Sequence, residues 1–233
     1  WSSVYTTPQT TQNNTALLGL NGKYALTDNW TLQGSLYGRF FRQSHVDGND
    51  GDFERCSNSS SYANHLCLED DGFARPVPFT GAAARAFRDQ FAILDANNQP
   101  IPCPPGAGNT CGPVPYGTID RTNTRSTTFG GSLQATNDAK LFDHGNRFVI
   151  GGSIDRGNTD FNGSSMLGYI FPDLSVGSNP AIPGMGSVIH TVGDVGYAPL
   201  GITTRNTYYG IYATDTFDIT DHLAATAGVR YNI

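Results

Sequence analysis

Six segments of the sequence alternate between apolar and polar residues with a period of two, and this pattern constrains the fold more than any other feature. The clearest segment lies between residues 30 and 40. One face carries Trp30, Leu32, Gly34, Leu36, Gly38 and Phe40, and the other carries Thr31, Gln33, Ser35, Tyr37 and Arg39. Such alternation is typical of β-strands whose two faces meet different surroundings. It predicts strands at about 15–26, 30–42, 124–137, 147–159, 205–219 and 223–233.

The connections between the predicted strands alternate between short turns and two long loops, at about 43–123 and 160–204. Compact soluble domains seldom contain such long loops without structure of their own. Outer-membrane β-barrels combine short periplasmic turns with long extracellular loops. A strand of about 11 residues, tilted by roughly 45°, covers about 25 Å, which is the height of the apolar band of these barrels. The sequence therefore predicts an all-β fold, an antiparallel transmembrane β-barrel.

The low charge of the chain agrees with this interpretation. Charged residues make up 15% of the sequence, against about 25% in an average soluble domain. No apolar run approaches the roughly 20 residues of a transmembrane helix, and the 28 glycines disfavour an all-helical fold. The net charge of −6 argues against nucleic acid as a partner, because phosphate binding depends largely on Lys and Arg.

A soluble β-sandwich is the structural alternative, since it also consists of alternating strands and turns. The span 41–126 is far longer than the loops of such a domain. Six strands are too few to close a membrane barrel, because the smallest have eight. On the membrane interpretation, we expect the chain to be a slice of a larger barrel.

Two hairpins in the sequence have related turns, Leu26-Thr27-Asp28-Asn29 and Ile219-Thr220-Asp221-His222. Thr and Asp suit these turns because their side chains bond to nearby backbone amides. With the strands around them, including 209–217 and 227–231, the hairpins resemble the barrel of TonB-dependent outer-membrane receptors. The pair 128–136 and 146–152 is similar to a strand pair of the siderophore-receptor branch.

This resemblance implies a 22-stranded barrel around an N-terminal plug domain that contacts TonB. No plug is recognisable in the sequence, so we expect residues 1–233 to form about six interior strands of that barrel. The resemblance also implies a place in the bacterial outer membrane, contact with the lipid bilayer and energy-dependent uptake of a small-molecule ligand. An iron–siderophore complex or a similar scarce chelate is the expected ligand, and TonB would act through the absent plug.

Four side chains on the predicted lumenal face are candidates for binding the ligand near the outer rim: Tyr37, Arg39, Asn206 and Tyr208. Arginine suits an anionic chelate because its planar group pairs with carboxylates or catecholates. The alternative role of these four residues is hydrogen bonding within the barrel wall and packing against the plug.

All four cysteines fall in the first long loop, at Cys56, Cys67, Cys103 and Cys111. An even number in one extracellular loop predicts disulfides. Three connectivities are possible, and the short separations favour Cys56 with Cys67 and Cys103 with Cys111. A zinc site is the alternative, but the spacing does not match that of zinc ribbons.

Three further patterns occur in or near this loop. Residues 82–96 predict a short helix, with Phe87, Phe91 and Leu94 at helical spacing. The acidic stretch 47–54 has oxygen ligands for calcium but lacks the EF-hand register, so it is interpreted as a solvated acidic turn. His45 and His65 are alternative haem contacts, although exposed histidines are the simpler interpretation.

No catalytic constellation is recognisable, since the sequence has no nucleophile elbow, phosphate-binding glycine loop or metal-binding histidine pair. We therefore expect no enzymatic activity, no cofactor and no bound metal. The expected function is ligand import across the outer membrane. The alternatives are a passive porin or structural barrel, and a secreted β-rich adhesin.

Overall fold

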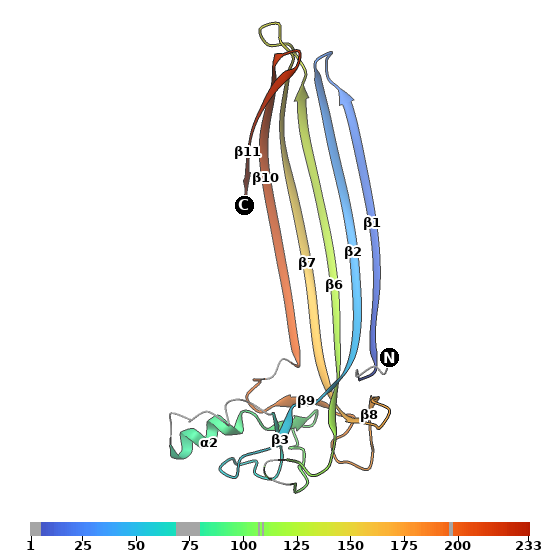
Figure 1. The fold of residues 1–233 in the computed structure, drawn as a ribbon, viewed down its shortest axis with the longest axis vertical. Helices are drawn as coiled ribbons and strands as arrows, with labels where there is room; N and C mark the ends of the chain where they lie inside the picture. Colours follow the sequence, from blue (N-terminus) through green and yellow to red (C-terminus); the bar gives the residue numbers. More distant parts are fainter. Residues whose placement is uncertain (1–5, 69–79, 107, 109, 196–197) are drawn as a thin grey trace. The chain divides into compact units, whose positions relative to one another are not determined.

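The computed structural model describes residues 6–68, 80–106, 108, 110–195 and 198–233. The all-β, antiparallel part of the prediction is confirmed. The long strands are β1 (Gln9–Ala25), β2 (Trp30–Asp50), β6 (Tyr116–Asn137), β7 (Asn146–Ile170), β10 (Leu200–Thr220) and β11 (Leu223–Asn232). They lie side by side in the order β1-β2-β6-β7-β10-β11 (Figure 1). Strands β1 and β11 do not pair with each other, so the described sheet is open.

Each long strand overlaps one of the six predicted ranges, but four extend further at the end next to a long loop, and β1 begins earlier than predicted, at Gln9. Strand β2, for example, continues to Asp50, whereas the alternation predicted an end at residue 42. Side-chain hydrogen bonds accompany the pairing in these extensions: the Ser44 hydroxyl donates to Asn123 at 2.9 Å, and Thr11 Oγ1 lies 2.8 Å from His45 Nδ1. Backbone pairing does not require an apolar face. The extensions therefore lack the alternation of apolar and polar residues from which the strands were predicted.

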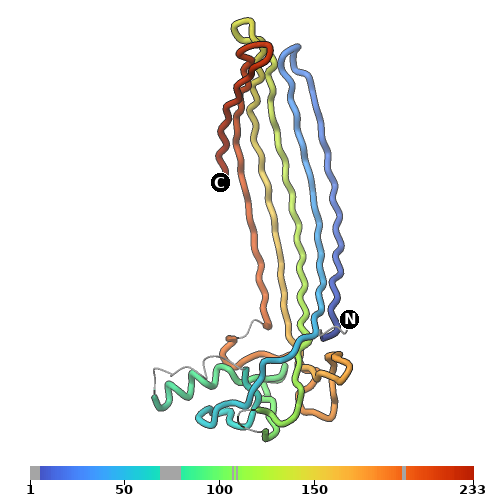
Figure 2. The backbone as a smooth tube through the Cα atoms, viewed as in Figure 1, coloured from blue at the N-terminus to red at the C-terminus, as the bar shows by residue number. Residues whose placement is uncertain are grey.

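The chain divides into two compact units, which we call the sheet unit and the loop unit. The sheet unit consists of 13–42, 124–160 and 203–233, and the loop unit contains 1–12, 43–123 and 161–202. The sheet unit therefore contains most of each long strand and the three short turns. Figure 2 shows how this arrangement brings β2 beside β6 and β7 beside β10, although long stretches of sequence separate them.

One face of the sheet unit exposes large apolar side chains. Leu36 is 63% exposed and Leu133 is 55% exposed. With Leu20 and Ile154 they line a shallow apolar groove that runs across β1, β2, β6 and β7. Exposed apolar residues at matching positions of the six strands include Leu18, Tyr24, Phe40, Phe129, Ile150, Tyr209, Ile211, Ile219, Leu223, Val229 and Tyr231. Such a continuous apolar surface is not typical of a soluble monomer.

The opposite face of the sheet unit is polar and is connected by hydrogen bonds between strands. Ser35 Oγ lies 2.8 Å from Ser132 Oγ. Gln134 donates to Gln33 at 2.8 Å and accepts a bond of 2.7 Å from the Tyr212 hydroxyl. These contacts join β2, β6 and β10, so the polar residues of the alternation satisfy one another across the sheet.

Threonine side chains stabilise the short turns, as the hairpin sequences predict. Thr27 Oγ1 accepts a bond of 3.1 Å from the Trp30 amide, and Thr220 Oγ1 accepts one of 3.3 Å from the His222 amide. Asp215 interrupts the apolar face, and a bulge that turns it inward is one expectation. The β10–β11 register shifts instead between Asp218 and Thr220, and Asn146 donates to Asp215 at 2.9 Å.

The loop unit contains short elements where the sequence predicts long loops. They are β3 (Phe53–Arg55), β4 (Leu66–Leu68), α2 (Gly81–Asp89), β5 (Ile93–Asp95), β8 (Val176–Gly177) and β9 (Val188–Thr191). Strand β3 pairs with β4, and β5 pairs with β9, so the two long loops are joined. Their shared core contains Leu66, Ile93, Ile101, Tyr116, Leu167 and Ile189.

The predicted helix 82–96 is wrong at its C-terminal end, because α2 ends at Asp89. The Phe91 amide bonds to the Arg88 carbonyl at 3.3 Å in a turn, and Leu94 lies in β5 opposite His190. The helical spacing of Phe87 and Phe91 still brings their rings to 5.5 Å. Pairing with a distant strand thus overrides the local pattern. Among the described residues, no helix is both long and apolar enough to cross a bilayer.

Two disulfides connect neighbouring cysteines, Cys56 to Cys67 and Cys103 to Cys111. This is the pairing that short separation favours. The first bridge packs with Phe91 and Ala92, and the second belongs to the core around Leu66. Both bridges therefore stabilise a small core that is built largely from loop segments.

Non-reducing mass spectrometry of the native protein is expected to recover these two disulfides as two separate cross-linked peptides. Each bridge closes a short loop whose ends the fold already holds together, which makes the neighbouring pairing the most accessible one. Four free thiols, or peptides that link Cys56 or Cys67 to Cys103 or Cys111, would contradict the pairing.

Candidate functional site

Of the four sequence-predicted ligand candidates, Tyr37 is the one whose side chain forms a hydrogen bond in the described structure. Its hydroxyl donates to Asp155 Oδ1 at 2.5 Å, across the intervening strand β6. Gly130 lies between the partners, and any side chain there would collide with both. Tyr37 is therefore held within the wall of the sheet unit, which is the alternative role considered for it.

Arg39, Asn206 and Tyr208 are exposed, and within the described ranges their side chains form no hydrogen bond or ion pair. Strands β7 and β10 keep one register, as the bonds from Thr203 to Asp160 and from Arg205 to Asn158 indicate. That register places Tyr208 opposite Asp155. Strands β6 and β7 lie between β2, which carries Tyr37 and Arg39, and β10, which carries Asn206 and Tyr208, so the backbones of the two pairs are about 14 Å apart across the sheet. The four candidates thus lie on one polar face without forming a cluster.

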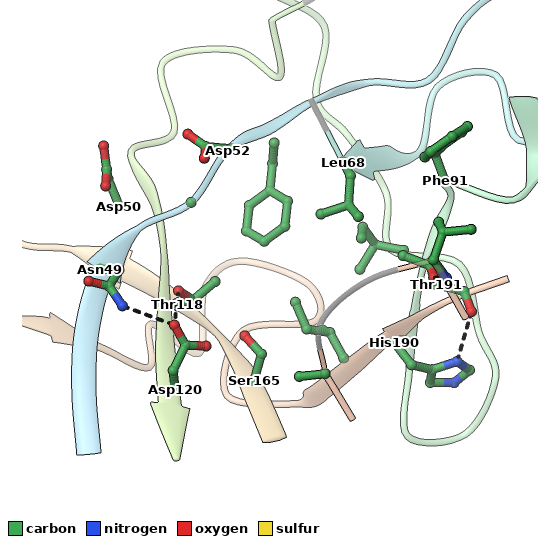
Figure 3. A pocket seen from close by; sticks show the side chains of 16 residues that line it. Asn49, Asp50, Asp52, Leu68, Phe91, Thr118, Asp120, Ser165, His190 and Thr191 are labelled. Atoms are coloured by element: carbon green, nitrogen blue, oxygen red, sulfur yellow. Dashed lines mark hydrogen bonds between the residues drawn. The ribbon is translucent and has the colours of Figure 1, made fainter. Parts of the chain in front are cut away.

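A pocket of about 690 Å³ lies entirely within the loop unit (Figure 3). Both long loops and the ends of long strands contribute to it. It is lined by Asn49, Asp50, Gly51, Asp52, Phe53, Leu68, Phe91, Ile93, Thr118, Asp120, Ser165, Ile189, His190, Thr191, Val195 and Ala198. Its volume is within the range of pockets for small molecules.

One side of the pocket is acidic. Asp120 is fixed there because its Oδ2 accepts bonds from Asn49 Nδ2 at 2.9 Å and from the Thr118 hydroxyl at 3.2 Å. Figure 3 shows both bonds. Asp50 and Asp52 are exposed residues of the same wall, at the end of β2 and just beyond it. Within this described lining there is no Lys or Arg to balance the three carboxylates.

Two polar atoms at the pocket have no partner among the described residues, Asp120 Oδ1 and Ser165 Oγ. Ser165 is only 5% exposed, and its hydroxyl is directed toward the space between the labelled side chains in Figure 3. A buried polar atom without a partner costs about 1–3 kcal/mol. Unsatisfied groups of this kind are therefore natural points for contact with an occupant.

The other side of the pocket is apolar. Phe53, Leu68 and Ile93 line it together with Ile189 from the second loop. The His190 ring lies at one end, where its Nδ1 is 3.3 Å from the Thr191 carbonyl oxygen. The pocket thus combines a hydrophobic wall with an acidic wall.

Hydrogen bonds to Asp89 hold the segment next to this apolar wall. The carboxylate accepts bonds from the Ser60 hydroxyl at 2.6 Å and the Ser61 amide at 2.8 Å. Burial acts to raise the pKa of Asp89, but these bonds outweigh it and lower the pKa below its ordinary value. The charged form of Asp89 therefore ties the end of α2 to the first disulfide hairpin.

This pocket is not predicted from the sequence, although the acidic stretch 47–54 was a signal for it. That stretch is not simply a solvated turn, because it contains the end of β2 and contributes Asn49, Asp50 and Asp52 to the lining. No group of three or more His, Cys, Asp or Glu side chains suited to a metal occurs in the described part of the chain. His45 lies beside Thr11, and His65 Nδ1 lies 3.2 Å from the Tyr62 carbonyl oxygen.

The two units offer different chemistry. The sheet unit presents an apolar face and a polar face, and the loop unit offers a pocket that suits a small molecule. No protein-family model and no curated protein matches this sequence.

Proposed function

We propose that this chain is part of a bacterial outer-membrane β-barrel that imports a scarce small molecule, with TonB supplying energy through a plug domain. The observation that carries the proposal is the division of the sheet unit into two faces. Leu36 and Leu133 are exposed on one face, while Gln33, Gln134 and Tyr212 are joined by hydrogen bonds on the other. Lipid is the surrounding that suits the first face, and a wet lumen suits the second.

The open sheet fits this role as a portion of a larger barrel. Every backbone group that faces the hydrocarbon region needs a hydrogen-bond partner, which an open edge does not supply. Strands of the same barrel would cover the edges of β1 and β11. The six strands and the resemblance to TonB-dependent receptors support a place within a 22-stranded barrel.

The loop unit supports the import function. It is a disulfide-linked structure whose pocket is built from both long loops. In this function it captures the ligand before transport through the lumen. An iron chelate is the first candidate for the cargo, because the strand pairs resemble those of siderophore receptors.

The location is tested with lipids that carry bromine on their acyl chains, which quench tryptophan fluorescence on contact. Trp30 belongs to the exposed apolar face, next to a short turn. In the whole protein reconstituted into such vesicles, we expect quenching that is weaker in Trp30→Phe than in the wild type, because the sequence also contains Trp1. A protein that is soluble, monomeric and cooperatively folded without detergent would contradict the membrane location. Iron-chelate uptake that is unchanged without TonB would contradict energy coupling and favour a passive porin.

A further inference from the structure

We propose that the pocket of the loop unit binds a small organic cation that has a primary ammonium or guanidinium group on an apolar body. The proposal names the class of ligand that the capture site binds. It rests on the proposed function only in treating the bound ligand as the cargo that is captured for import. The pocket chemistry itself comes from the acidic wall, the two unpartnered acceptors and the hydrophobic wall.

The charge of the lining selects the sign of the ligand. Asp50, Asp52 and Asp120 contribute three carboxylates, and the described lining contains neither Lys nor Arg. All three would repel an anionic chelate, so an iron chelate captured in this pocket carries a cationic group rather than the negative charge that Arg39 suggested. A cation is attracted, and the attraction is strongest where the pocket wall excludes water.

Asp120 provides the anchoring contact for the cation. Asn49 and Thr118 occupy its Oδ2 and fix the plane of the carboxylate, while its Oδ1 is buried and has no partner among the described residues. An ionised carboxylate only accepts hydrogen bonds. The missing partner is therefore a donor, and an N–H group of a cation makes the stronger, charge-assisted form of that bond.

Ser165 supplies an independent indication of an occupant. Its Oγ is buried, unpartnered in the described structure and directed into the pocket (Figure 3). Ser165 lies on β7, whereas Asp120 lies on β6, so two neighbouring strands present unsatisfied polar atoms to one space. An ammonium or guanidinium group has several N–H donors and can serve more than one acceptor.

The hydrophobic wall and the volume of the pocket suit an organic molecule better than a bare metal ion. Phe53, Leu68, Ile93 and Ile189 provide apolar surface that an ion would leave uncovered. Within the described chain, no cluster of three or more metal-binding side chains is present. A volume of about 690 Å³ suits an organic molecule. The apolar body of the ligand would cover the hydrophobic wall while its cationic end meets Asp120.

The test uses dansylcadaverine, a fluorescent primary amine with an aromatic body, and the whole protein in lipid vesicles. The N-acetylated form of the probe keeps the apolar body but has no charge. We expect the amine to bind with a blue-shifted emission and the acetylated probe to bind at least about tenfold more weakly, because charge-assisted hydrogen bonds contribute about one to two orders of magnitude. Binding should also weaken as salt increases.

The matched variants are Asp120→Asn, Asp50→Asn and Asp143→Asn. Asp120→Asn removes the anchoring charge with little change in shape, and we expect a tenfold to hundredfold loss of affinity. Asp50→Asn changes an exposed rim position and should weaken binding less, without affecting the fold. Asp143→Asn makes the same charge change in a turn of the sheet unit, at a positive φ that Asn tolerates, and should bind like the wild type.

The outcomes separate this inference from the proposed function. Equal affinity for the amine and its acetylated form, or wild-type affinity in both Asp120→Asn and Asp50→Asn, overturns the cation pocket. Trp30 quenching by brominated lipid in the same vesicles would still support the membrane location. Selective amine binding by a protein that proves soluble would keep the pocket and overturn the outer-membrane function.

Discussion

On the proposed function, Leu36→Arg is expected to prevent stable insertion of the protein into a lipid bilayer. Leu36 is 63% exposed on the apolar face and lies in the groove with Leu20, Leu133 and Ile154. An arginine on the lipid-facing surface near the bilayer midplane costs about 2–4 kcal/mol, which is a large part of the total stability of a typical domain. The measurement is the free energy of unfolding of the whole protein in lipid vesicles, obtained by titration with urea.

Ser35→Arg is the matched control, because it places the same side chain one residue away on the polar face. It removes the Ser35–Ser132 contact of 2.8 Å, a loss of about 1 kcal/mol. The arginine itself stays hydrated there. Equal destabilisation by the two substitutions, or no effect of Leu36→Arg, would show that the apolar face does not meet lipid.

Leu167→Ala is expected to loosen the loop unit. Leu167 is completely buried in the core with Leu66, Ile93 and Ile189. Its truncation removes apolar contacts and leaves a cavity, at a cost of about 2–5 kcal/mol. Amide hydrogen exchange measures the result locally, and exchange in β5 and β9 should accelerate at least about thirtyfold, since 1.4 kcal/mol corresponds to a factor of ten.

Leu141→Ala removes the same atoms from a side chain that is 45% exposed in a turn of the sheet unit. It should leave exchange in β5 and β9 unchanged. Unchanged exchange in Leu167→Ala would contradict the joint core of the two loops. Faster exchange confined to β7 would show instead that β5 and β9 are stable without the Leu167 side chain.

The period-two pattern predicted the sheet because each strand has two unlike surroundings. Positions such as Leu36 and Ser35 are adjacent in sequence but face opposite ways, so the pattern marks both the strand and its orientation. The ends near the long loops were missed for the same physical reason. Beyond residue 42, pairs such as Ser44 and Asn123 are polar, and no alternation distinguishes strand from loop.

The pocket was beyond sequence reasoning because its walls meet only through tertiary pairing. Asp52 and Asp120 come from the two ends of one long loop, and Ile189 and His190 come from the other. The pairing of Ile93 with Thr191 and of Leu94 with His190 joins them. Local spacing instead favoured a helix through Leu94. The disulfide pairing was easier to predict because each bridge depends on one short separation.

The construction of the pocket from two distant loops has a thermodynamic consequence. A ligand that binds the assembled pocket but neither loop alone adds its binding free energy to the folded state of the loop unit. At a free concentration 100 times its Kd, this is about 2.7 kcal/mol. A library of amines can therefore be ranked by the rise in Tm that each one causes, without labelling and before any transport is measured. The amine that raises the Tm most would then be the first candidate for the ligand of the pocket.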